Sequence, residues 1–145
     1  MAITTRVFFY IRQVEQLVNQ SVEEALQPHG LTAGQYMVLS LVAHHEPVSS
    51  AELARLVRKT AQYIGEYVKA LAALGLVERR DDPGNRRILL VSTSPQGRAL
   101  LMRCEAAIDE AEQVFLNCLD PEERATLRHA LARLRNAAIQ RQHEA

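Results

Sequence analysis

The sequence has little of several residue types on which specialised proteins depend. Its 145 residues include two cysteines and no tryptophan, and aromatic side chains make up 5% of them. Two cysteines cannot form the disulfide framework that staples small secreted domains. No apolar run approaches the roughly 18 residues of a membrane span, and the N-terminus lacks the features of a secretory signal. We therefore expect a soluble, cytoplasmic protein that makes no contact with a membrane.

A net charge of one sign is also absent, because 17 basic and 17 acidic side chains cancel. Nucleic-acid-binding proteins usually carry a basic excess, so the total argues mildly against that class. The distribution along the chain points the other way, since residues 51–103 hold ten basic and five acidic side chains. Arginine, which makes forked contacts to phosphate and guanine, supplies most of these basic groups. A neutral total thus conceals a basic middle segment between acidic ends.

Long helices are predicted at both ends of the chain. Residues 5–26 place apolar side chains three or four positions apart, which gives a helix with one apolar stripe. A heptad seam from Leu101 to Cys118 predicts a second helix of about 24 residues. Asp120 and Pro121 begin a third, which carries its own leucine stripe. One chain of this size cannot cover all three stripes, so we expect a homodimer; a monomeric helical bundle is the alternative.

Two short helices joined by a tight turn are predicted in the middle of the chain. A capping box at Ser49 and Glu52 begins the first helix. Thr60 caps the second helix, which Gly75 ends. A capping box at Thr32 begins a largely apolar helix before them, which we expect to lie centrally. Two short helices with so small a turn form a helix-turn-helix.

A hairpin is predicted directly after these helices. Two β-prone runs lie on either side of a turn at Pro83 and Gly84. Arg86 and Arg87 at its tip suit insertion into a minor groove or a grip on phosphate. A helix-turn-helix followed by a hairpin is a winged helix. The predicted fold class is mostly α with a small β-hairpin wing (α+β): a winged helix-turn-helix with long N- and C-terminal dimerisation helices.

Three segments around the wing resemble the signature of the MarR family, the multiple antibiotic resistance regulators. They are Leu74–Arg80, Asp82–Arg87 and Ser94–Gly97. The resemblance covers essentially the whole chain. It implies a homodimeric transcription regulator that binds pseudo-palindromic double-stranded DNA and is often released by a small ligand or by oxidation.

The resemblance also implies a division of labour along the chain. Residues 1–145 would form one unit, with the DNA-binding lobe at 32–93 and dimerisation helices at 1–31 and 94–145. Three positions depart from the family pattern. Asn85 stands where the family has aspartate, Thr93-Ser94 replaces Leu-Thr, and Glu66 occupies a position that is often basic. These departures imply that an ion pair in the wing is lost and that the DNA target cannot be inferred by analogy.

Candidate DNA-binding residues share positions in the helix-turn-helix or the wing. Residues in the first turn of the second helix reach base edges, and its outward face is polar. The predicted DNA-binding residues are Ser49, Arg58, Thr60, Gln62, Tyr63, Lys69, Arg86 and Arg87.

Candidate ligand-binding residues lie on the first and second helices. Phe9, Tyr10 and Tyr36 could enclose a small aromatic or apolar ligand, and Arg12 could pair with its carboxylate. The resemblance implies such a cleft where the first, second and fifth helices of MarR-like dimers meet. The same aromatic side chains would equally serve as dimer core.

Redox, metal and enzyme chemistry find little support in the sequence. Cys104 and Cys118 fall on equivalent positions of the heptad seam, about 21 Å apart along one helix, which predicts packing rather than a disulfide. His44 and His45 point in different directions on a helix and lack chelating company, so we expect no metal and no cofactor. No catalytic motif is present, and we expect no enzyme.

The sequence therefore predicts a sequence-specific DNA-binding transcription regulator, a ligand-released repressor that acts as a homodimer on a pseudo-palindromic operator. The alternative is a winged-helix protein-interaction module that does not bind DNA. Zero net charge and Glu66 favour this alternative slightly, whereas the basic wing favours the regulator.

Overall fold

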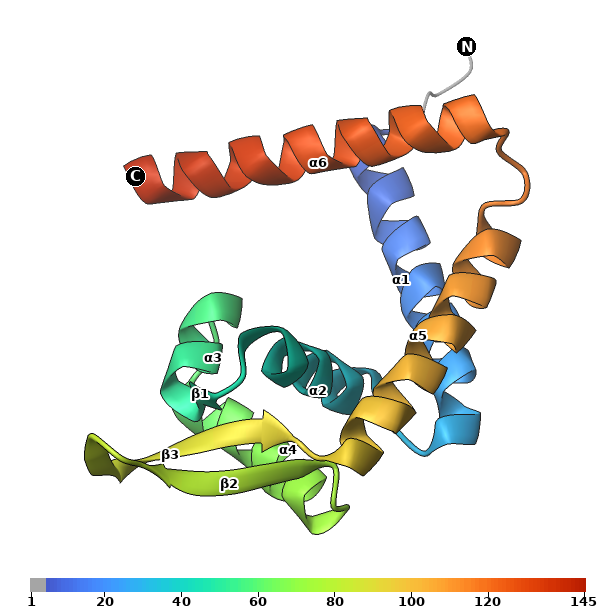
Figure 1. Ribbon diagram of the computed structural model, residues 1–145. Helices are drawn as coiled ribbons and strands as arrows, with labels where there is room; N and C mark the ends of the chain where they lie inside the picture. The colour runs from blue at the N-terminus through green and yellow to red at the C-terminus, as the bar shows by residue number, and fades with distance from the viewer. Residues whose placement is uncertain (1–4) are drawn as a thin grey trace. The chain divides into compact units, whose positions relative to one another are not determined.

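A computed structural model describes residues 5–145, which form two compact units. The first unit ends at Ala111 and the second begins at Glu112, so that the fifth helix contributes to both. The elements, in chain order, are α1 (Val7–Leu26), the short 3-10 helix η1 (Gln27–His29), α2 (Ala33–His45), β1 (Val48–Ser49), α3 (Ser50–Val57), α4 (Ala61–Ala73), β2 (Val77–Asp82), β3 (Asn85–Thr93), α5 (Pro95–Phe115) and α6 (Pro121–Glu144) (Figure 1).

Local capping residues explain where several helices begin. Thr32 accepts a hydrogen bond from the Gln35 backbone and the Gln35 side chain accepts one from the Thr32 backbone, so the predicted capping box is present. Ser49 accepts from the Glu52 amide, as predicted. The Glu52 carboxylate pairs with Arg55 instead of accepting from the Ser49 amide, so only half of the predicted capping box is formed. These caps satisfy amides that a helix start leaves without a partner.

The core of the first unit forms around α2. Val38, Leu39 and Val42 of this helix are fully buried. The inward face of α4 packs into the same cluster, as do Leu53 of α3 and Val91 of β3, and Leu101 and Cys104 of α5 complete it. Burial of an aliphatic side chain contributes about 1.5–3 kcal/mol. The prediction that the second helix is central is confirmed.

The wing is a twisted hairpin with one additional strand. β2 and β3 pair antiparallel, with Val77 opposite Thr93 and an irregularity at Asp81 and Asp82 near the tip. β1 pairs antiparallel with β3 on the other side, so the strand order is β1-β3-β2. The sequence did not predict β1, because two residues are too short to show an alternating pattern. The mostly helical fold with a small β wing is confirmed.

The fifth helix is shorter than the heptad seam predicts. It ends at Phe115, and Cys118 lies exposed in the following turn rather than on the helix. Arg124 of α6 stabilises this turn: Nε donates to the carbonyls of Leu116 and Leu119, at 3.1 and 3.0 Å. The prediction that both cysteines occupy one helical seam is therefore wrong.

Apolar side chains of α1 and α6 remain uncovered in the single chain. Phe8 of α1 is 83% exposed and Phe9 is 57% exposed. On α6, the predicted stripe of Leu127, Leu131 and Leu134 is between 39% and 55% exposed. Stripes of this kind on otherwise polar helices are typical of surfaces that a partner covers.

Gly97 in the first turn of α5 is buried where the chain has no room for a side chain. A Cβ at this position would collide with the carbonyl oxygen of Leu76. We expect Gly97→Ala to lower the free energy of unfolding by about 1–3 kcal/mol. Urea denaturation at a fixed protein concentration measures the change.

Gly65→Ala provides the control, since a Cβ at this position of α4 meets nothing within 4 Å. Alanine should raise stability there by about 0.5–1 kcal/mol through helix propensity. A Gly97→Ala protein as stable as Gly65→Ala would contradict the close contact with Leu76.

Candidate nucleic-acid interface

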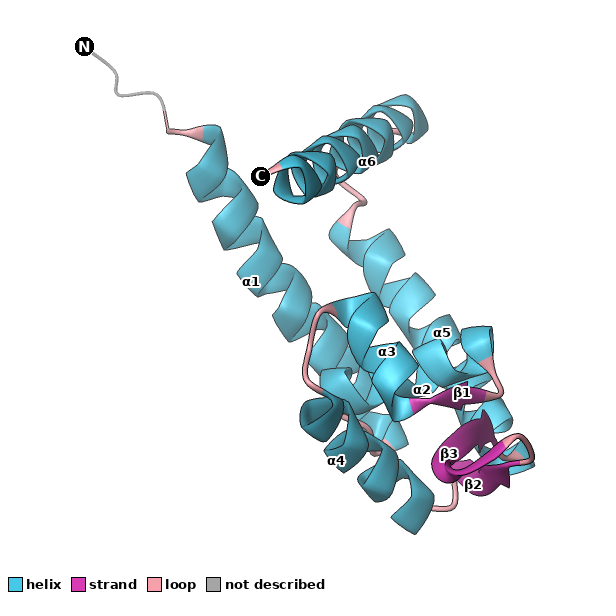
Figure 2. Ribbon diagram, turned by 90° about the vertical axis from the view of Figure 1, so that its left-hand side faces the viewer, coloured by secondary structure: helices cyan, strands magenta, loops and turns pink. Residues whose placement is uncertain are grey.

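The helix-turn-helix consists of α3, a three-residue turn and α4. Arg58 ends α3 in the left-handed conformation, with φ 54°, and its amide donates to the Ala54 carbonyl. The Lys59 amide bonds to the same carbonyl, and Thr60 begins α4 by accepting from the Tyr63 amide at 3.0 Å. This tight turn directs α4 across α3, with both helices and the hairpin on the side that faces the viewer in Figure 2.

The outward face of α4 is polar and exposed. Ile64, Val68 and Leu71 are buried on its inner face, as predicted from their spacing. Gln62, Glu66 and Lys69 are exposed on the opposite face. An α-helix that buries one face and exposes a polar one can enter a major groove. Ser49 is half-buried at the start of α3, where its hydroxyl serves as the N-cap.

The wing places two arginines close to its tip. Arg86 and Arg87 are exposed at the start of β3, and neither side chain has an ion pair in the part of the chain that the structure describes. Asn85 accepts a hydrogen bond from the Arg87 amide at 3.1 Å, and Asp82 accepts one from the Gly84 amide at 2.9 Å. These two local bonds shape the tip and leave both guanidinium groups available to an anionic partner.

The base of the wing is held by hydrogen bonds at its junction with α5. The Ser94 hydroxyl donates to the Gly75 carbonyl at 2.6 Å and accepts from the Gly97 amide at 3.0 Å. The Ser94 amide also donates to the Leu76 carbonyl. The last residue before α5 thus bonds to the end of α4 and the start of β2.

A carboxylate from the end of α2 strengthens this junction. Glu46 accepts from both the amide and the hydroxyl of Thr93, at 2.6 and 2.7 Å. Arg98 of α5 donates to the Thr93 carbonyl at 3.0 Å. Burial raises the pKa of Glu46, but the Thr93 bonds and the Arg98 charge outweigh burial and lower it overall. Sequence reasoning missed Glu46, because no local pattern links it to Thr93, 47 positions away. It also gave no structural role to Arg98, which lies five positions from Thr93.

Comparison with known proteins gives this arrangement a family. The MarR family profile matches residues 29–88. The HTH-type transcriptional repressor Rv2887 of Mycobacterium tuberculosis is 30% identical over 117 residues, which cover 80% of this chain and 84% of that protein. The chain belongs to the MarR family.

Solved structures of transcription regulators share the fold. A probable transcriptional regulator from Pseudomonas aeruginosa is 36% identical and has a TM-score of 0.73, covering 89% of this chain and 96% of that one. A cysteine-to-serine mutant of MarR from Escherichia coli in complex with operator DNA is 25% identical, with a TM-score of 0.79, covering 88% and 92%. Because these relatives are transcription regulators, the prediction that the chain is not an enzyme is confirmed.

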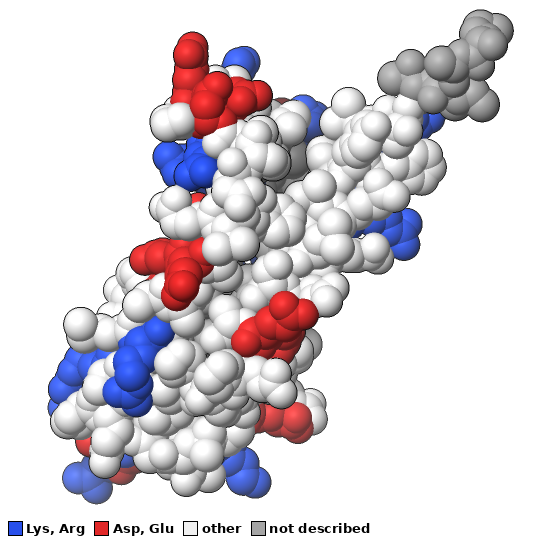
Figure 3. Space-filling model, turned by 90° about the vertical axis from the view of Figure 1, so that its right-hand side faces the viewer, with Lys and Arg blue, Asp and Glu red and all other residues white. Residues whose placement is uncertain are grey.

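Asn85 and Glu66, two of the positions that depart from the MarR pattern, can be placed in the structure. Asn85 accepts from the Arg87 amide, so at this position of the wing a neutral amide makes a local hydrogen bond where the family has a carboxylate. Glu66 is exposed on the outward face of α4 between Gln62 and Lys69. Figure 3 draws the side of the molecule opposite to that of Figure 2, where basic and acidic side chains are scattered. On the outward face of α4, the Glu66 carboxylate lies one turn from Lys69 and reduces the attraction of this helix for phosphate.

The candidate ligand-binding residues are not brought together in one chain. Tyr36 is half-buried on α2; burial and a hydrogen bond to the Glu105 carboxylate raise its pKa. Phe9, Tyr10 and Arg12 are exposed on the N-terminal half of α1, which extends away from α2 in both Figure 1 and Figure 2. A site made of all four requires a partner helix to close it.

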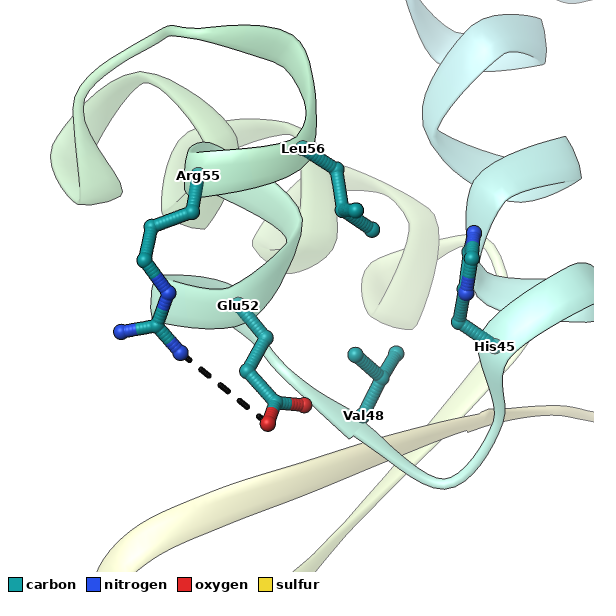
Figure 4. Close-up of a pocket in the computed structure, with 5 residues that line it drawn as sticks. All are labelled: His45, Val48, Glu52, Arg55 and Leu56. Atoms are coloured by element: carbon teal, nitrogen blue, oxygen red, sulfur yellow. Dashed lines mark ion pairs between the residues drawn. The ribbon is translucent and has the colours of Figure 1, made fainter.

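A surface hollow lies between the end of α2 and α3 (Figure 4). It is lined by His45, Val48, Glu52, Arg55 and Leu56. Its Glu52–Arg55 ion pair measures 4.0 Å and is exposed, so it adds little to stability.

His44, which the sequence raised as a possible metal ligand, bonds through Nδ1 to the Ser40 carbonyl at 2.7 Å. Within residues 5–145, no three His, Cys, Asp or Glu side chains are grouped to hold a metal ion, and no helix is long and apolar enough to cross a membrane.

The lowered pKa of Glu46 predicts how the junction responds to acid. A depressed folded-state pKa stabilises the protein above about pH 4.5, and this contribution is lost as the pH falls through the folded pKa. We expect Glu46→Gln to be about 1–3 kcal/mol less stable than the wild type at pH 7. The variant should then lose less stability than the wild type between pH 6 and pH 3, as followed by urea denaturation.

The control is Glu110→Gln, which changes an exposed carboxylate on α5. Its stability should follow the wild-type pH dependence. A Glu46→Gln protein with the same acid sensitivity as the wild type would show that Glu46 does not carry the effect.

Proposed function

We propose that this DNA-binding transcription regulator is a homodimeric repressor of a pseudo-palindromic operator, which a small ligand releases from DNA. The observation that carries the proposal is that α4 exposes a polar face and that the wing of the same unit exposes Arg86 and Arg87. In this proposal residues 32–93 are the DNA-binding lobe, and residues 1–31 and 94–145 carry the dimer contacts.

Two relatives support repression and DNA binding by name. The Mycobacterium tuberculosis protein is a transcriptional repressor, and the Escherichia coli MarR mutant was solved on operator DNA. This chain covers 84% and 92% of those two chains. We therefore expect the same class of action here.

Dimerisation follows from the uncovered apolar stripes. Phe8 and the leucines of α6 are exposed in the single chain, and a second copy is the simplest cover for them. A two-fold dimer would place its two α4 helices in successive major grooves, about one helical turn or 34 Å apart. The operator would then be pseudo-palindromic.

The side chains divide into base-reading and phosphate-binding groups. Gln62, in the first turn of α4, is placed to read a base edge, where a bidentate amide prefers adenine. Arg86 and Arg87 would enter a minor groove or bind phosphate. The remaining predicted residues would bind the sugar-phosphate backbone around the recognition helix: Ser49, Arg58, Thr60, Tyr63 and Lys69.

One feature favours a protein-interaction module instead. Glu66 lies in the middle of the exposed face of α4, where a carboxylate repels phosphate although it can accept a hydrogen bond from cytosine. Salt dependence separates the two functions, because DNA binding weakens steeply with salt through counterion release.

We expect Arg87→Ala to weaken binding to duplex DNA and to lower the salt slope by about one, since it removes one cationic contact. Gln62→Ala should instead cost roughly 1–3 kcal/mol on the preferred sequence and little on unrelated DNA. Fluorescence anisotropy measures both on a duplex enriched by the protein from a random library, with two chains bound per duplex.

Arg103→Ala, on α5, is the control for loss of an exposed arginine. It should leave affinity and salt slope unchanged. An Arg87→Ala protein with wild-type affinity would contradict the DNA-binding role of the wing. A single chain bound per duplex would contradict the dimer.

Release by a small ligand is proposed for the region between α1, α2 and α5 of the dimer. A ligand can act only through a difference in affinity between the DNA-competent and DNA-incompetent states. Tenfold weaker DNA binding needs about 1.4 kcal/mol of such a difference. Oxidation is disfavoured at Cys104, because the thiol is buried and burial raises its pKa.

We expect an aromatic carboxylate such as benzoate to release the protein from DNA in a gel shift, with no release by peroxide or chelators. The Arg12→Ala variant should bind DNA normally but respond less to benzoate. Release by peroxide that Cys118→Ser abolishes would instead make the exposed thiol a redox sensor.

A further inference from the structure

Three side chains form a stack along one flank of the recognition helix. The Lys59 ammonium lies over the Tyr63 ring, 5.4 Å from its centroid. Tyr67, one turn further along α4, meets Tyr63 edge to face, with centroids 5.2 Å apart and the rings at 70°. The Tyr63 ring is therefore held by a cation and by a second ring, both favourable geometries for an aromatic side chain. We call Lys59, Tyr63 and Tyr67 the tyrosine stack.

The inner end of the tyrosine stack rests on the backbone of α2. Tyr67 is half-buried against the core. A Cβ added to Gly34, in the first turn of α2, would collide with the Tyr67 hydroxyl and ring. The Glu23 carboxylate at the end of α1 accepts from the Ala33 amide at 3.2 Å, which fixes the same turn of α2. Gly34 thus determines where the Tyr67 ring can lie.

A hydrogen bond connects the two tyrosines. This bond to Tyr63 is the main cause that raises the pKa of Tyr67, followed by burial. A phenol hydroxyl is both a donor and an acceptor, so either tyrosine can donate in this pair. Donation from Tyr67, whose hydroxyl lies against Gly34, leaves the Tyr63 proton available to a partner outside the chain. Tyr63 is 38% exposed in the first turn of α4, where such a partner can reach it.

We propose that the Tyr63 hydroxyl donates to a phosphate of duplex DNA beside the major groove, and that Tyr67 and Gly34 are positioning residues that hold it there. The inference rests on the proposed function, because it takes duplex DNA as the ligand. A donor whose rotamer is fixed before binding loses little conformational entropy on contact. A hydroxyl that accepts one hydrogen bond is also polarised as a donor to the next.

The sequence alone predicts Tyr63 as a DNA-binding residue but gives no role to Tyr67 or Gly34. Gly34 lies behind Tyr67 on a central helix, so any effect of Gly34 on DNA affinity must pass through the stack. That dependence separates positioning from direct contact.

A double-mutant cycle on the full chain tests the hydrogen-bonded pair. We expect Tyr63→Phe and Tyr67→Phe each to weaken DNA binding about threefold to tenfold. The double variant should be no weaker than Tyr63→Phe alone, because Tyr67 acts only through Tyr63. The loss should be equal on the enriched duplex and on a shuffled duplex, and the salt slope should not change, since a neutral hydroxyl releases no counterion.

Three outcomes would overturn the inference: wild-type affinity for Tyr67→Phe, multiplied losses in the double variant, or a loss confined to the enriched duplex. The last would make Tyr63 a base-reading residue. If the wild type binds no duplex at all, the proposed function itself fails. If binding depends on Arg87 but the losses from Tyr63→Phe and Tyr67→Phe multiply in the double variant, only this inference fails.

Gly34→Ala supplies an independent readout. The added methyl group displaces the Tyr67 ring, while alanine is the better helix former, so the unfolding temperature should not fall. DNA binding should weaken about threefold to tenfold in the wild-type background and not in the Tyr63→Phe background. Undiminished DNA binding by Gly34→Ala in the wild-type background would overturn the role of Gly34. An equal loss of binding in the Tyr63→Phe background would show that the effect of Gly34 does not pass through Tyr63.

Discussion

The close approach of Gly97 to the Leu76 carbonyl is the constraint on which the arrangement of the DNA-binding elements depends. It lets α5 begin directly against the start of β2, and Ser94 bonds to Gly75 at the same point. The recognition helix ends there and the wing begins there, so both are attached to one place on α5. Glu46 adds the end of α2 through Thr93. A movement of the start of α5 would therefore move the end of the recognition helix and the base of the wing together.

The chemistry of the surface is consistent with a regulator that binds DNA through few contacts. The chain has no net charge, and Glu66 lies one turn from Lys69 on the outward face of α4. Long-range attraction to DNA therefore comes from the basic middle segment alone, and groups whose positions are fixed before binding add to the affinity. The wing tip, ordered by Asn85 and Asp82, and the tyrosine stack, seated on Gly34, are both examples of such fixed groups.

The helices at the two ends of the chain serve a different purpose. Their apolar stripes lie outside the core of the winged helix, where Phe8 and Leu134 are more than half exposed. In the proposed dimer, a second copy that covers these stripes would also set the distance between the two recognition helices. Assembly and operator spacing would then be the same physical variable, and a ligand that changed one would change the other.

The sequence by itself determined the parts of the structure that depend on neighbouring residues. The capping box at Thr32, the left-handed Gly75 and the inward spacing of Ile64, Val68 and Leu71 all act within a turn or two, so the helix-turn-helix, the wing and the exposed face of α4 could be predicted. Tertiary structure alone decided contacts between distant residues. Arg124 fixes the turn after Phe115, which a heptad pattern cannot show, and β1 exists only because β3 pairs with it. Glu46 reaches Thr93, and Tyr67 rests on Gly34, across segments with no common periodicity. Phe9 and Tyr36 remain apart in the single chain, because an apolar stripe specifies that a helix must be covered but not by what.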